Sequence, residues 1–122
     1  MHIQELCDKA HKAAKTKGFW DKPKEIGTTL MLIVSELGEA LEAHRHNKHA
    51  YISNFIINVN DSHAKYNSNF EINIKDTFED EIADTFIRLG DFCASLGIDI
   101  EKHIKLKMKY NSNRPYKHGK EY

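Results

Sequence analysis

Apolar side chains recur at helical spacing in four segments of this 122-residue chain, and this periodicity is the strongest constraint on its fold. Gly18 and Gly97 follow two of the segments as natural helix stops. Asp76 and Asp99 precede the third and fourth segments as N-caps, and Glu79 would complete a capping box with Asp76. We therefore predict four helices, over about residues 3–17, 24–47, 76–96 and 99–111.

The second predicted helix is the most apolar. Residues 30–34 are apolar around the whole circumference, so we expect this helix to be central and covered on several sides. Residues 48–75 interrupt the pattern and are rich in Asn and Ser. Apolar and polar residues alternate with a period of two over 70–75, and less cleanly over 55–59, where Phe55, Ile57 and Val59 are the apolar members. We predict a β-hairpin or an irregular arm there.

These patterns together predict one all-α domain over residues 1–122, with a four-helix core and an insertion at about 48–75 between the second and third helices. Lys plus Arg and Asp plus Glu both number 18, which argues against a nucleic-acid-binding or polybasic membrane-surface protein. The longest apolar run is five residues, too short for a membrane span. Without an apolar leader, and with Cys7 and Cys93 interpreted as reduced core thiols, we expect a cytoplasmic protein.

Two pairs of carboxylates are the candidate functional residues. Glu36 and Glu39 are three apart on the second helix, and Glu81 and Asp84 are three apart on the third. Side chains at this spacing are neighbours on a helix, so each pair could converge on one point. Two such helices side by side would present four carboxylates, a set of oxygen ligands suited to Mg²⁺ or Mn²⁺.

The positions of these carboxylates support a cation site more than their spacing does. Both pairs lie at the margin of an apolar stripe. Two carboxylates about 6 Å apart repel each other by about 3 kcal/mol at an effective dielectric constant near 20, so a fold that keeps four of them together is poorly stabilised without a cation. The alternative is a solvated acidic face, in which Asp84 pairs with Arg88 and Glu42 with His46.

Two other metal sites receive less support. Di-iron carboxylate bundles use Glu-x-x-His on two helices, and this spacing does not occur anywhere in the sequence. His44, His46 and His49 cluster after the second helix, but they lack Cys partners and a zinc-like spacing. A solvated helix end is the better interpretation of these histidines.

The segments 30–45 and 79–89 resemble the MazG-like all-α nucleotide pyrophosphohydrolases, whose signature is E-x-x-E on one helix and E-x-x-D on the next. The C-terminal segment, which carries Lys107, Asn111 and Arg114, resembles that family as well. The resemblance covers about residues 24–46 and 76–120.

This resemblance implies an enzyme that hydrolyses a nucleoside triphosphate to a monophosphate and pyrophosphate. Glu36, Glu39, Glu81 and Asp84 would hold Mg²⁺, with Mn²⁺ as an alternative, and would form the catalytic centre. Any one of these carboxylates could act as the base towards the attacking water. Lys107, Asn111 and Arg114 would contact the triphosphate or the sugar.

Trp20 could stack on the base, or it could fill the core between the first two helices.

The resemblance also implies a homodimer or homotetramer. One departure from the family is the interval between Glu39 and Glu81, which the segment 48–75 lengthens. This segment could be a subunit arm, a lid or an inert insertion. The alternative function is a non-catalytic helical oligomer that binds nucleotide or a protein partner, and a purely structural helical dimer is a third possibility.

Overall fold

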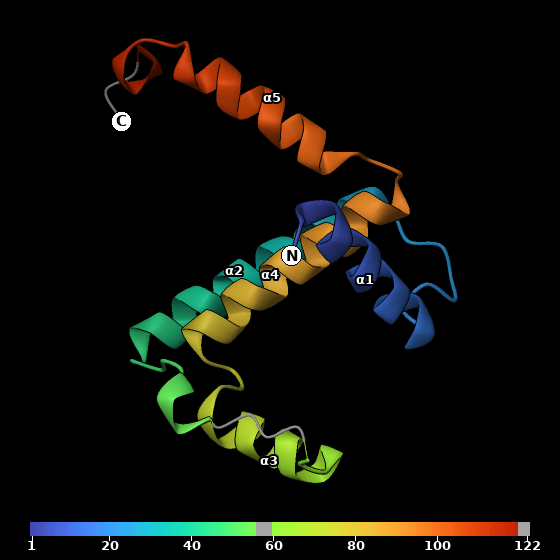
Figure 1. The fold of residues 1–122 in the computed structure, drawn as a ribbon, viewed down its shortest axis with the longest axis vertical. Helices are drawn as coiled ribbons and strands as arrows, with labels where there is room; N and C mark the ends of the chain where they lie inside the picture. The colour runs from blue at the N-terminus through green and yellow to red at the C-terminus, as the bar shows by residue number, and fades with distance from the viewer. Residues whose placement is uncertain (56–59, 120–122) are drawn as a thin grey trace. The chain divides into compact units, whose positions relative to one another are not determined.

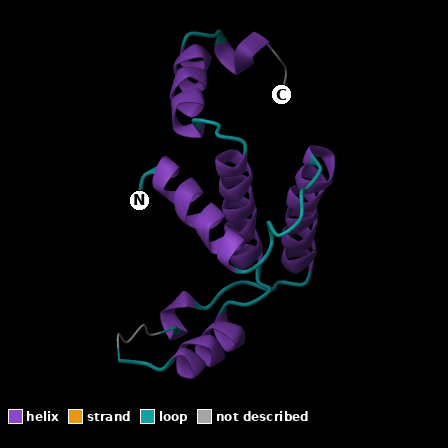
Figure 2. Ribbon diagram, turned by 90° about the vertical axis from the view of Figure 1, so that its right-hand side faces the viewer, coloured by secondary structure: helices purple, strands orange, loops and turns teal. Residues whose placement is uncertain are grey.

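The computed structural model describes residues 1–55 and 60–119, and every regular element within these ranges is helical (Figure 2). The α-helices are α1 (Ile3–Thr16), α2 (Ile26–Arg45), α3 (His63–Asn73), α4 (Phe78–Ser95) and α5 (Ile100–Ser112). Short 3-10 turns occupy Ile52–Asn54 and Tyr116–Gly119. The prediction of an all-α fold is confirmed for the part of the chain described, and no helix there is long and apolar enough to cross a membrane.

The ends of the predicted helices are mostly confirmed. Gly18 and Gly97 have φ angles of +85° and +65°, a left-handed conformation that glycine adopts without steric cost. The Asp99 side chain accepts a hydrogen bond from the Lys102 backbone N–H at 3.2 Å and caps α5 as expected.

The predicted start of α4 is wrong. This helix begins at Phe78, and the Thr77 hydroxyl accepts the Asp80 backbone N–H at 3.3 Å. Asp76 instead adopts a left-handed conformation, with a φ of +62°, and donates its N–H to the Asp80 carboxylate at 2.9 Å. Glu79 does not complete a capping box, because its carboxylate accepts the Ala50 N–H at 3.0 Å.

The predicted β-hairpin is also wrong where the structure describes the insertion. Residues 70–73, taken as strand from their alternation, form the last turn of α3. Ser62 caps this helix by accepting the Lys65 N–H, and Tyr66 and Phe70 lie one turn apart with their rings 5.1 Å and 6.4 Å from that of Phe55. This N-cap and aromatic packing favour a helix over the period-two pattern. Ile57 and Val59 of the other predicted strand lie outside the described residues.

The chain divides into two compact units, and the first consists of residues 1–21 and 89–122. In this unit α1 packs against the end of α4. A Cβ atom at Gly90 would lie 3.3 Å from the Cys7 Cα, so the absence of a side chain at Gly90 permits the close approach. Cys7 and Cys93 are both buried and free, in agreement with their interpretation as core thiols.

The second unit consists of residues 22–88 and contains α2, α3 and the first part of α4. Here α2 and α4 run side by side (Figure 1). The residues buried between them are partly polar: they are Ile33, Glu36, Ala40 and Ala43 of α2, with Thr77, Glu81 and Thr85 at the start and along the first part of α4.

The expectation that residues 30–34 are covered on several sides is wrong for the single chain. Ile33 is buried, but Met31 and Val34 are 63% and 51% exposed, and Leu30 and Leu32 are also exposed. The apolar circumference of α2 therefore leaves one face without cover in the chain described.

Candidate metal site

Three of the four predicted carboxylates converge between α2 and α4. Glu36, Glu39 and Glu81 each offer an oxygen, and these oxygens lie within 4.8 Å of one another. Glu36 and Glu81 are only 7% and 6% exposed, whereas Glu39 is exposed. The i, i+3 spacing on α2 and the side-by-side packing of the two helices thus bring the carboxylates together as the sequence suggested.

Asp84, the fourth predicted ligand, lies one turn beyond Glu81 and is half-buried, outside the group of three. Burial raises the pKa of its carboxyl group, and the negative charges of Asp80 and Glu36 raise this pKa further. Asp84 lines a second cavity of about 380 Å³, next to Asp76 and Asp80. The Asp84 side chain is therefore influenced by the charges of the neighbouring carboxylates, but it faces the second cavity and not the group of three.

Arg88 provides a positive charge at the site. Its Nε donates to Glu36 Oε1 at 2.7 Å, from α4 across to α2. The alternative of a surface pair between Asp84 and Arg88 is not observed in the part of the chain described, although the predicted pair of Glu42 and His46 is, at 3.3 Å. Arg88 thus compensates the charge of a buried carboxylate instead of that of a solvated one.

The buried carboxylates share a proton when no cation is bound. Burial raises the pKa of Glu81, and its neighbours Glu36 and Glu39 raise it further, to about 8. Burial also acts to raise the pKa of Glu36, but hydrogen bonding with Glu81 and Glu39 and the hydrogen bond from Arg88 outweigh it and lower this pKa. At neutral pH we therefore expect Glu81 to carry the proton and Glu36 the negative charge.

The group has the chemistry of a divalent-cation site. Glu81 Oε2 is buried and has no hydrogen-bond partner, which is costly for a carboxylate oxygen and leaves it available to a ligand. All the available donors are carboxylate oxygens, the hard ligands that Mg²⁺ and Mn²⁺ prefer. The residues present are therefore suited to the ion that the sequence predicted.

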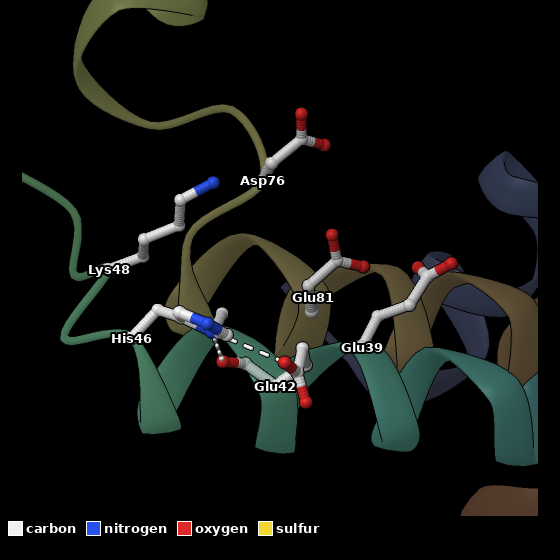
Figure 3. Close-up of a pocket in the computed structure, with 7 residues that line it drawn as sticks. Glu39, Glu42, His46, Lys48, Asp76 and Glu81 are labelled. Carbon is white, nitrogen blue, oxygen red and sulfur yellow. Dashed lines mark hydrogen bonds and ion pairs between the residues drawn. The ribbon is translucent and has the colours of Figure 1, made fainter.

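A cavity of about 440 Å³ opens beside these carboxylates (Figure 3). Glu39 and Glu81 line one part of it, while Lys48, His46 and Asp76 line the part nearest the loops. This cavity is large enough to admit a phosphorylated small molecule, and it combines acidic groups for a cation with a lysine that can bind an anion.

The residues predicted to contact substrate lie in the other unit. Lys107 and Arg114 both lie over the Tyr110 ring, with Nζ and Cζ 5.0 Å and 5.4 Å from its centroid, and Asn111 follows on the same helix. Trp20 is half-buried and donates its indole N–H to the Asp91 carboxylate at 2.8 Å. This contact joins Trp20 to α4 within the first unit.

Two residues of the site were not assigned to it from the sequence. Arg88 lies seven residues after Glu81, two helical turns along the same face, so this spacing could have revealed it. Lys48 gave no such signal. It reaches the cavity because the loop after α2 returns to α4, where the Lys48 carbonyl accepts the Phe78 N–H at 2.9 Å.

Comparison with known proteins assigns no family to this chain. No protein-family model matches the sequence, and no match is found among curated proteins or solved structures. A functional assignment therefore depends on the geometry of the carboxylates and on the resemblance of their motifs.

Stability should depend on pH through Glu81. The folded metal-free protein retains a proton on Glu81 up to about pH 8, whereas the unfolded chain releases it near the ordinary value of 4.5. The free energy of unfolding should therefore fall as pH rises between these values, and the raised pKa of Asp84 acts in the same direction. Melting curves recorded with a chelator should show this fall, and Glu81→Gln should flatten it. Parallel slopes for the two proteins would contradict the shared proton.

Stability should also depend on Arg88. Arg88→Ala leaves the buried Glu36 without its cation, and we expect the free energy of unfolding of the metal-free protein to fall by roughly 1–3 kcal/mol. This is less than for a fully buried pair because the Arg88 side chain is 44% exposed. Arg45→Ala is the matched control, since Arg45 pairs with Glu42 at 3.8 Å on the surface, and it should change stability by less than about 1 kcal/mol. Equal losses in urea titrations of both variants would refute the special role of Arg88.

Proposed function

We propose that the protein is a Mg²⁺-dependent nucleoside triphosphate pyrophosphohydrolase, which converts a ribo- or deoxyribonucleoside triphosphate to the monophosphate and pyrophosphate. The observation that carries this proposal is the convergence of Glu36, Glu39 and Glu81 beside a cavity, with a buried carboxylate oxygen that has no partner. The resemblance of both acidic motifs to those of the MazG-like enzymes supports the same assignment.

The residues of the second unit have distinct parts in this reaction. When bound, Mg²⁺ would lower the pKa of the attacking water and offset charge on the leaving pyrophosphate. Glu36 and Glu81 are buried, whereas Glu39 is exposed at the cavity and is the carboxylate best placed to accept a proton from the water. Lys48 lies on the same cavity and would bind a phosphate oxygen of the substrate.

The remaining predicted residues complete the proposal. Asp84 would act as the fourth carboxylate of the centre. Lys107, Asn111 and Arg114 stay candidates for contacts to the triphosphate or the sugar, because a triphosphate carries about four negative charges and needs several donors. Trp20 can offer only a ring face or edge to a base, since its N–H already binds Asp91.

We further propose that two copies of the chain associate through α2. Seven large apolar side chains of this helix are exposed in the single chain, which is more than an isolated helix usually presents to water. They are Ile26, Leu30, Met31, Leu32, Val34, Leu37 and Leu41. The exposed apolar side chains are equally expected in the second candidate function, a non-catalytic helical oligomer that would bind nucleotide without releasing pyrophosphate.

Turnover should require the carboxylates. With the common nucleoside triphosphates as substrates, we expect monophosphate and pyrophosphate only in the presence of Mg²⁺. Glu36→Gln and Asp84→Asn should each reduce the rate by at least about a hundredfold, because each removes a charge from the cation site. Glu5→Gln, which alters a surface carboxylate on α1, is the matched control.

Circular dichroism should show unchanged helicity in all three variants. Wild-type rates in both site variants would refute the assignment of the site. Binding of nucleotide without products in the wild-type protein would favour the non-catalytic alternative.

The apolar face of α2 should determine the oligomeric state. Light scattering coupled to size-exclusion chromatography should give the mass of a dimer or tetramer for the wild-type protein. Introducing charges with Met31→Glu and Val34→Glu should lower this mass, because a charge is costly to bury at an interface. Ile72→Glu, at a still more exposed apolar residue of α3, should leave the mass unchanged. A monomeric wild-type protein would contradict this proposal.

A further inference from the structure

We propose that Asp76, Asp80 and Glu81 form a second divalent-cation site, adjacent to the first and sharing Glu81 with it. Each of these residues offers a carboxylate oxygen, and the three oxygens lie within 4.8 Å of one another. A catalytic role for this second site rests on the proposed function, but the binding of a second cation can be measured without any turnover.

The backbone at the start of α4 fixes this second group. Asp76 adopts a left-handed conformation just before the helix, and its N–H donates to Asp80 Oδ2 at 2.9 Å. The Thr77 hydroxyl, which accepts the Asp80 N–H and donates to the Ile74 carbonyl at 2.6 Å, holds the turn from the other side. The carboxylates of Asp76 and Asp80 are thus brought towards Glu81 by the helix cap itself.

Glu81 supplies the observation that points to a ligand. It is 6% exposed, and its Oε2 is buried without a hydrogen-bond partner. Figure 3 shows its carboxylate between those of Asp76 and Glu39, so the same side chain faces both acidic groups. A carboxylate has two oxygens and can therefore contribute one to each of two neighbouring cations.

The distribution of positive charge distinguishes the two groups. Arg88 compensates Glu36 at 2.7 Å in the first group. Within residues 1–55 and 60–119, no Lys or Arg forms an ion pair with Asp76, Asp80 or Glu81. Lys48 lines the larger cavity and Lys75 the smaller one, but neither is within salt-bridge distance of these carboxylates. The second group thus brings negative charges together without compensation from the chain.

The donor set indicates the class of cation. Three carboxylates, with Asp76 lining both cavities, leave coordination positions for water or for phosphate oxygens. Mg²⁺ and Mn²⁺ are commonly bound in this way, by few carboxylates and several waters, whereas Ca²⁺ requires more protein ligands. A pair of such ions can contact both the attacking and the leaving oxygens of a phosphoanhydride.

Titration with Mn²⁺, without nucleotide, tests this proposal on the full chain. We expect the wild-type protein to bind two Mn²⁺ ions whose electron paramagnetic resonance signals are coupled. Asp76→Asn should weaken the binding of one of these ions at least about tenfold and abolish the coupling between the two, because it removes a charged ligand. Asn tolerates the left-handed backbone of Asp76, so the fold should be retained. Glu71→Gln alters a carboxylate that lines the smaller cavity outside the group, and it should leave both ions bound.

Each outcome decides between the two sites. A single Mn²⁺ ion that is lost in Glu36→Gln and unaffected in Asp76→Asn would overturn the second site and leave the proposed function standing. Two bound ions in Asp76→Asn with the wild-type affinity and coupling would also overturn it. The absence of any Mn²⁺ binding would overturn both this site and the cation site of the proposed function.

Discussion

Burial of two carboxylates between α2 and α4 is the constraint on which the second unit depends. Glu36 and Glu81 are almost completely removed from water and close enough to repel each other. Arg88 compensates one of them, and a proton compensates the other. Neither arrangement satisfies Glu81 Oε2, so the metal-free fold retains an unfavourable interaction that a divalent cation would remove.

The partly polar contact between α2 and α4 leaves the large apolar side chains of α2 outside that contact. Because α2 uses a narrow line of small and acidic residues against α4, its large apolar side chains are directed elsewhere and remain exposed in the single chain. Association of two chains through this face, as proposed above, would couple the integrity of the site to the oligomer. The arrangement of residues along α2 thus produces both the buried carboxylate and the exposed apolar face.

The sequence predicted the features that depend on local spacing. The four helices, the glycine stops, the cap at Asp99 and the placing of Glu36 and Glu39 as neighbours on α2 all follow from residue types and spacing within one helix. Features that depend on contacts between segments could not be predicted in this way. The helix α3 is stabilised by packing on Phe55, Arg88 binds across to α2, and Lys48 is positioned by a loop that returns to α4. The alternation over 70–75 was misleading because packing against a neighbouring aromatic residue outweighed it.

The central claim is that a cation replaces a proton in the buried carboxylate group, and proton release on metal binding tests this claim most directly. Mg²⁺ would be added to weakly buffered protein at about pH 7, and the released protons would be counted. The account predicts release of about one proton per chain at saturation, because the pKa of Glu81 is raised to about 8 in the metal-free protein, and it predicts little release from Glu81→Gln. Mg²⁺ binding without proton release, or equal release from the variant, would contradict it.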